Sequence, residues 1–136
     1  MLRLKIVVAE RRPMVFSAIE EGLQTRGVYA NLVAALSFQD LLRLVQTEED
    51  CIVVSGHLLS GFTTNEGMAK ELKRVNPRLV FVVYNGVVEK FNRVVDLRIP
   101  TYVQRGDVSI GVHIVDFLSK HVFGPDSGYA VQLQLF

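Results

Sequence analysis

Short apolar segments rich in β-branched residues alternate with amphipathic segments along this chain, and this alternation limits its fold more than any other feature. Each short segment is a continuous apolar run instead of the every-second-residue pattern of a half-exposed strand. Continuous runs are typical of strands covered on both faces, as in a parallel sheet. We expect five strands, at residues 4–9, 29–36, 51–54, 79–84 and 101–103.

Segments with helical spacing separate these strands. Pro13 suits the first turn of a helix, where its missing N–H needs no partner, and Gly27 is placed to end that helix. Ser37, with Asp40 three residues later, is typical of a helix N-cap. Three more helices are expected: one at residues 63–77, one at 87–95, and one that Asp107 caps and that carries an apolar stripe from Ile110 to Leu118. The order βαβαβαβαβα requires helices on both faces of the sheet, so we predict an α/β fold with a five-stranded, doubly wound parallel sheet.

Charge and composition exclude several classes of protein. Fifteen basic and fourteen acidic residues give a formal net charge of +1, without the basic excess that coating a nucleic acid requires. Cys51 is the single cysteine, so no disulfide can form within the chain, which suits a reducing compartment. No run approaches the roughly 18 apolar residues of a membrane span. We therefore expect a cytoplasmic protein that does not bind membranes.

The turns after the strands lack the motifs of enzymes with this architecture. The first turn, AERRPM, has none of the glycines that a dinucleotide-binding turn needs for close approach to a pyrophosphate. Ser55 and His57 suggest a nucleophile and a base, but no glycine precedes Ser55 by two residues as in a nucleophile elbow. His113 and His121 are more typical of surface or packing residues than of metal ligands. We predict no catalytic activity, no metal and no cofactor.

The order of the elements, together with Glu10 at the end of the first strand and Pro13 three residues later, resembles the receiver domain of two-component response regulators. The resemblance covers residues 4–123 and is closest to LuxR-type receivers. Their first turn reads Asp-Asp-His-Pro where this chain has ERRP, and their fifth strand reads Gly-Tyr-Leu-Leu-Lys where it has TYVQR. The segment DCIVVSGHLLSG is similar to the family pattern D-x-x-x-x-D-x-x-x-P-x-G. The resemblance as a whole implies a flavodoxin-like (βα)5 receiver fold over residues 1–123, followed by a tail at 124–136.

The residues that would carry receiver chemistry differ from the family pattern. The resemblance implies phosphoryl transfer to an aspartate that, with an acidic pair, holds Mg²⁺. Ser55 occupies the position of that acceptor, and a neutral hydroxyl brings no charge to a metal site. Of the acidic pair Glu10 remains, and Arg11 stands in place of the second carboxylate. We expect a protein cation where the metal would lie, with Glu10 paired to Arg11 or Arg105.

The switch positions differ too. By resemblance, Tyr84 replaces the Thr or Ser that ends the fourth strand, and Arg105 replaces the Lys of the fifth strand, which keeps the charge but not the compact ammonium. Tyr102 corresponds to the family's aromatic switch residue. We interpret the chain as a pseudo-receiver, in which the scaffold is retained and phosphorylation is lost.

The resemblance implies a regulatory module of signal transduction that acts by dimerisation or by binding a protein partner. Receivers of the LuxR type usually precede a DNA-binding domain, so the resemblance implies a role in transcription regulation. The chain is then either one domain of a longer regulator, with such an output domain outside these residues, or a free-standing adaptor. The tail begins with a turn-rich stretch at residues 124–128, and its closing segment YAVQLQLF alternates apolar and polar residues like a half-buried strand. We expect the tail to pack on its own domain or to add to a partner as a strand or dimer contact.

An alternative function is a flavodoxin-like domain that binds a small anionic ligand in the altered pocket at the strand ends. Arg11, Arg105 and the Ser/Thr-rich loop at residues 60–65 would hold the anion. The pocket distinguishes the two functions. A wide basic cavity favours the ligand, whereas a pocket filled by Arg11 and Tyr84 favours the pseudo-receiver.

Overall fold

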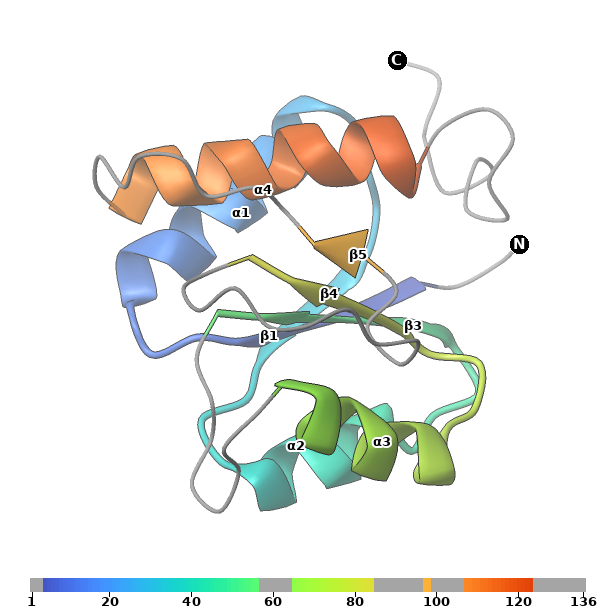
Figure 1. The fold of residues 1–136 in the computed structure, drawn as a ribbon. Helices are drawn as coiled ribbons and strands as arrows, with labels where there is room; N and C mark the ends of the chain where they lie inside the picture. The colour runs from blue at the N-terminus through green and yellow to red at the C-terminus, as the bar shows by residue number, and fades with distance from the viewer. Residues whose placement is uncertain (1–3, 57–64, 85–96, 99–106, 124–136) are drawn as a thin grey trace.

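The computed structural model describes residues 4–56, 65–84, 97–98 and 107–123. Strands and helices alternate along residues 4–83, and a short strand and a helix follow them in the described residues (Figure 1). In chain order the elements are β1 (Leu4–Ala9), α1 (Pro13–Thr25), β2 (Asn31–Ala34), α2 (Phe38–Val45), β3 (Asp50–Ser55), α3 (Asn65–Val75), β4 (Val80–Val83), β5 (Leu97–Arg98) and α4 (Asp107–His121).

The strands form one parallel sheet in the order β2-β1-β3-β4-β5. The predicted α/β fold with a parallel sheet is therefore confirmed. β1 to β4 contain four to six residues each and β5 only two, so the described chain has four full strands where we predicted five. The strand expected at residues 101–103 and the helix expected at 87–95 lie outside the described residues.

The second strand is shorter than predicted. We expected residues 29–36, whereas β2 covers Asn31–Ala34 and leaves Tyr29 and Leu36 exposed. The physical reason is its place in the sheet, because β2 lies at an edge and pairs with β1 on one side. An edge strand lacks the second neighbour that would extend its hydrogen-bonded ladder.

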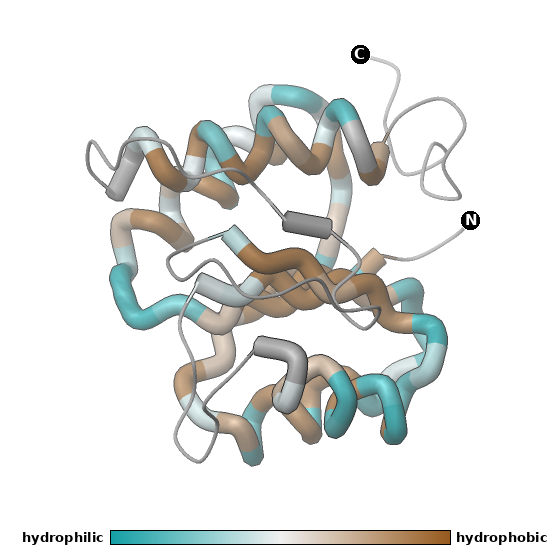
Figure 2. The backbone as a smooth tube through the Cα atoms, viewed as in Figure 1, coloured by the Kyte–Doolittle hydropathy of each residue, from teal (hydrophilic) through white to brown (hydrophobic). Residues whose placement is uncertain are grey.

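Two apolar cores lie on opposite faces of the sheet. α1 and α4 cover one face, and α2 and α3 cover the other (Figure 1). Successive residues of β1 alternate between the cores: Ile6 and Val8 pack beneath α1 and α4, and Val7 and Ala9 beneath α2 and α3. The middle residues of β1, β3 and β4 are apolar and buried, because both faces of these strands are covered (Figure 2).

Glycines bring α1 and α4 close together. A Cβ on Gly22 would lie 2.9 Å from Val115 Cγ2, and a Cβ on Gly111 would collide with the side chain of Ala18. Arg26, at the end of α1, forms an ion pair with Asp116 of α4. These contacts keep α4 in place against α1.

The sequence signals for helix ends agree with the structure. The Ser37 hydroxyl accepts a hydrogen bond from the Asp40 N–H at 3.1 Å, as an N-cap does. Gly27, which follows the C-cap residue Arg26 of α1, has a φ of 70°, a conformation that favours glycine. Among the described helices, none is long and apolar enough to cross a membrane.

Candidate functional site

The carboxyl ends of β1, β3 and β4 meet at one edge of the sheet. Ala9 is in register with Ser55, and Ser55 is in register with Val83. Glu10 and Tyr84, which directly follow β1 and β4, are 3% and 1% exposed. In the described part of the chain, Glu10 and Ser55 are the polar or charged residues that are buried, and both lie at this edge. The buried polar and charged residues of the described chain therefore lie at the strand ends, where a parallel α/β sheet carries its site.

The Glu10 carboxylate is held by several donors. Oε1 accepts hydrogen bonds from the Arg12 backbone N–H at 3.0 Å and from Arg12 Nε at 2.8 Å. Oε2 accepts one from Arg12 Nη2 at 3.1 Å and one from the Tyr84 hydroxyl. The two parallel guanidinium bonds are the bidentate geometry that makes arginine–carboxylate pairs strong. A buried negative charge is stabilised in this way by an adjacent cation and by the phenol.

Tyr84 fills the space above the end of β3. Its backbone N–H donates to the Ser55 carbonyl at 3.1 Å, and a Cβ on Gly56 would overlap the Tyr84 ring. The ring therefore lies directly against the Gly56 backbone. Burial raises the pKa of Tyr84 far above its ordinary value, and the neighbouring Glu10 carboxylate raises it further. The phenol consequently stays protonated and donates to Glu10.

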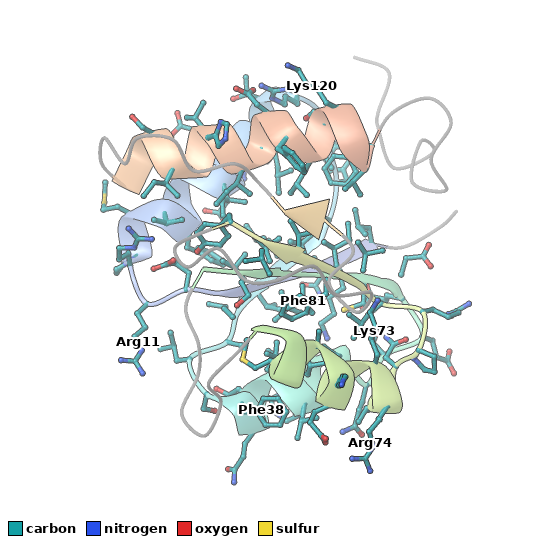
Figure 3. All side chains as sticks on the ribbon, in the orientation of Figure 1. Arg11, Phe38, Lys73, Arg74, Phe81 and Lys120 are labelled. Atoms are coloured by element: carbon teal, nitrogen blue, oxygen red, sulfur yellow. The ribbon has the colours of Figure 1, made fainter. Side chains whose placement is uncertain are left out.

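Arg12 contacts Glu10 because of the proline that follows it. Pro13 begins α1 and keeps the preceding residue extended, and Arg12 has φ −85° and ψ 111°. Its side chain does not cap the helix but folds back two residues onto Glu10. We expected Arg11 or Arg105 as the cation. Arg11 is exposed and points away from the body of the molecule (Figure 3), and Arg105 lies outside the described residues.

Ser55 lies at the same edge but belongs to the other face of the sheet. It is in register with Ala9 and Val83, which both pack in the core beneath α2 and α3. Tyr84 packs in the core beneath α1 and α4. The structure thus brings Glu10 and Tyr84 together, while the Ser55 side chain leads toward the opposite core.

Sequence reasoning missed two residues of this site, Arg12 and Gly56. Arg12 has a local signal, because a proline follows it directly. The sequence signal for Gly56 is weaker: a glycine follows a buried strand, and an aromatic residue follows a neighbouring strand. The roles expected for Tyr102 and for the loop at residues 60–65 remain predictions, because Tyr102 and residues 60–64 lie outside the described residues and nothing is described of the side chain at position 65.

The residues present do not fit the Mg²⁺ ion that the resemblance implies. A metal would have to displace a guanidinium or the phenol from Glu10, and Ser55 supplies no charge. Among the described residues, no three side chains of His, Cys, Asp or Glu lie together as a metal site. Glu10, Arg12 and Tyr84 thus form a buried polar network in which the carboxylate is already bound by protein donors.

Comparison with known proteins supports the fold. No protein-family model matches the chain, and no curated protein sequence matches it. The BeF₃-activated receiver domain DrrB is similar in structure, with a TM-score of 0.57 and 14% identity over 88% of this chain and 99% of that one. An adenylate cyclase from Rhodopirellula baltica has a TM-score of 0.55 and 10% identity over 88% of this chain and 94% of that one. At these identities the likeness concerns the fold alone, and we conclude that the chain has a receiver-like fold.

Proposed function

We propose that this chain is a regulatory module of signal transduction whose receiver-like domain works without phosphorylation. The observation that carries the proposal is the network at the strand ends, where buried Glu10 is paired with Arg12 and Tyr84. In receivers this edge of the sheet gathers acidic residues around a metal. Here the corresponding carboxylate is neutralised by the chain itself, so the site has no need of an ion from solution.

The energetics of the network favour this function over a metal-dependent one. The Glu10 side chain is fully buried and that of Arg12 is 27% exposed. Removing the guanidinium to admit a metal would leave a buried charge without its partner, which costs about 3–5 kcal/mol in comparable pairs. Ser55 would offer the incoming metal no compensating charge. We therefore propose that the chain is not an enzyme and does not take part in a phosphorelay.

A module that does not transfer phosphate acts through its surfaces. We propose that it forms a homodimer or binds a protein partner, in the manner of a LuxR-type pseudo-receiver, and regulates transcription through a DNA-binding domain outside these residues. The same proposal includes three further points: a complete (βα)5 alternation, a contact made by the tail at residues 124–136, and a cytoplasmic location. What supports them is the receiver-like fold of the described residues.

The alternative, a small anionic ligand at the strand ends, is less well supported. The Tyr84 ring occupies the space against Gly56, and the charge of Arg12 is already used by Glu10. Arg11, which was expected to hold the anion, is exposed. No observation on the described residues favours this second function.

Amide NMR titrations with Mg²⁺ and then beryllofluoride test the proposed function. The amide resonances of Glu10, Ser55 and Gly56 are expected to stay unchanged. The reason is that Arg12 and Tyr84 already donate hydrogen bonds to the Glu10 carboxylate. A receiver domain that binds beryllofluoride, such as DrrB, serves as the positive control under the same conditions. Saturable shifts of these resonances would contradict the proposal.

A further inference from the structure

We propose that Tyr84 is a resident ligand of the pocket at the strand ends: its phenol occupies the place of a molecule from solution and holds the ends of β1, β3 and β4 in one arrangement. The inference deepens the proposed function, on which it rests, by naming what keeps the domain independent of a signal. The pocket is a binding site for a phenol, and the chain supplies the phenol itself.

The contacts of Tyr84 are those of a bound ligand. Its hydroxyl donates to the buried carboxylate that follows β1, and its backbone N–H donates to the Ser55 carbonyl at the end of β3. Its ring belongs to the apolar core that contains Val15, Val54 and Ile114. One directed polar contact at the end of an apolar pocket is the usual way in which a small aromatic molecule is oriented.

Gly56 shows that the pocket is shaped for a ring. The φ of Gly56 does not lie in the left-handed region, so its backbone conformation is open to other residues. What excludes a side chain at this position is space, because a Cβ would overlap the Cζ, Cε2 and hydroxyl oxygen of Tyr84. The glycine is thus explained by the phenol and not by the turn.

Arg12 orients the acceptor for the phenol. Both of its guanidinium bonds and its backbone N–H fix the plane of the Glu10 carboxylate, with Oε2 facing the Tyr84 hydroxyl. Burial and the nearby carboxylate raise the pKa of Tyr84, so the hydroxyl keeps the proton that it donates. The Tyr84 hydroxyl therefore keeps its proton, and the Glu10 carboxylate keeps the orientation in which it accepts the hydrogen bond.

Replacing the side chain by a free phenol tests the inference. Tyr84→Ala leaves an apolar space with Glu10 at its end, and p-cresol has the shape and the hydroxyl of the lost side chain. We expect p-cresol at tenfold excess over its Kd to raise the Tm of Tyr84→Ala by roughly 3–6 °C. Toluene, which lacks the hydroxyl, is expected to give a smaller rise.

Val83→Ala is the matched control, because Val83 is the neighbouring buried residue of β4 and packs in the opposite core. Its Tm is expected not to respond to p-cresol, and neither is that of the original chain, whose pocket is full. Failure of p-cresol to stabilise Tyr84→Ala, or an equal rise for Val83→Ala, would overturn the inference.

Tyr84→Phe keeps the test decisive if Tyr84→Ala does not fold, because the ring remains and only the hydroxyl is removed. Amide hydrogen exchange at Glu10 and Gly56 is expected to become about tenfold faster than in the original chain, the equivalent of one lost hydrogen bond. Unchanged exchange would overturn the inference. Binding of beryllofluoride by the original chain contradicts the proposed function, whereas indifference of Tyr84→Ala to p-cresol contradicts the resident ligand.

Discussion

Two arginine–carboxylate ion pairs of this protein lie in different surroundings. One is Glu10–Arg12 at the strand ends, and the other is Arg26–Asp116 between α1 and α4. The Glu10 side chain is fully buried, whereas those of Arg26 and Asp116 are 40% and 46% exposed. Water and salt weaken the exposed pair, so it stabilises the fold by at most about 1 kcal/mol. The buried carboxylate depends on its partners, because hydrogen bonds from Arg12 and Tyr84 compensate for its loss of solvation. The burial of an ion pair therefore decides how much the fold loses in stability when the pair is broken.

A glycine also accompanies each pair, and again the surroundings differ. Gly22 faces Val115, whose methyl groups end a short side chain. Gly56 faces the ring of Tyr84, which is tied to Glu10 at its far end. A side chain added at Gly22 therefore meets a neighbour on the adjacent helix, while one added at Gly56 must break a buried polar network.

The largest expected effect is the loss of the buried carboxylate. Glu10→Ala is expected to lower the free energy of unfolding by about 3 kcal/mol, because it leaves the Arg12 guanidinium and the Tyr84 hydroxyl without their acceptor. Asp116→Ala, the matched change in the exposed pair, is expected to lower it by less than about 1 kcal/mol. Urea denaturation of the two variants measures both values. Equal losses would show that burial does not separate the two regions.

Gly56→Ala is expected to cost about 2 kcal/mol, because the new methyl group displaces the Tyr84 ring. Combined with Tyr84→Ala, the same substitution should cost almost nothing. A double-mutant cycle measures this coupling, and Gly22→Ala with Tyr84→Ala provides the uncoupled control. If the costs of Gly56→Ala and Tyr84→Ala simply add, the ring does not depend on the glycine.

Alkaline pH is expected to weaken the buried site. The folded chain keeps the Tyr84 proton at a pH where the unfolded chain loses it, because burial and Glu10 raise the pKa of Tyr84 in the folded state. Stability should fall above about pH 10, with a slope that approaches about 1.4 kcal/mol per pH unit. Tyr84→Phe should remove this contribution, while Tyr29→Phe, a change at an exposed tyrosine, should leave it.

Cys51 also makes stability depend on pH in this range, and a comparison of the original chain with Tyr84→Phe cancels its contribution. Burial raises the pKa of its thiol from 9.0 to about 11, so its own contribution to stability is lost as the pH rises through that range. This loss is common to the original chain and to Tyr84→Phe. The difference between their pH profiles therefore reports Tyr84, and parallel profiles would contradict the assignment.

The smallest expected effect is in the exposed pair. Arg26→Gln is expected to change the free energy of unfolding by about 0.5 kcal/mol at low salt, and by less at 1 M salt, because ions screen an exposed pair. Arg12→Gln, the corresponding change at the buried carboxylate, should keep most of its effect at 1 M salt. Equal salt dependence of the two variants would contradict the distinction between the regions.

Local signals predicted much of the fold correctly. Pro13 and Ser37 stand at helix beginnings and Gly27 follows a helix end, because caps and backbone conformations involve residues close in the chain. The extent of β2 was wrong, since a strand's length depends on its neighbours in the sheet. The register of the strands also placed Ser55 toward the core opposite Tyr84, which no local pattern could indicate.

By itself, the sequence determined the alternation of strands and helices, the coverage of the sheet on both faces, and the residues at the strand ends, Glu10, Ser55 and Tyr84. The tertiary structure decided which of these residues meet. Tyr84 reaches Glu10 across 74 positions of the chain, and Arg12, not the Arg11 that we expected, folds back onto the carboxylate. Apolar periodicity is a property of neighbouring residues, whereas a buried hydrogen bond depends on register, backbone direction and the space that a residue such as Gly56 leaves open.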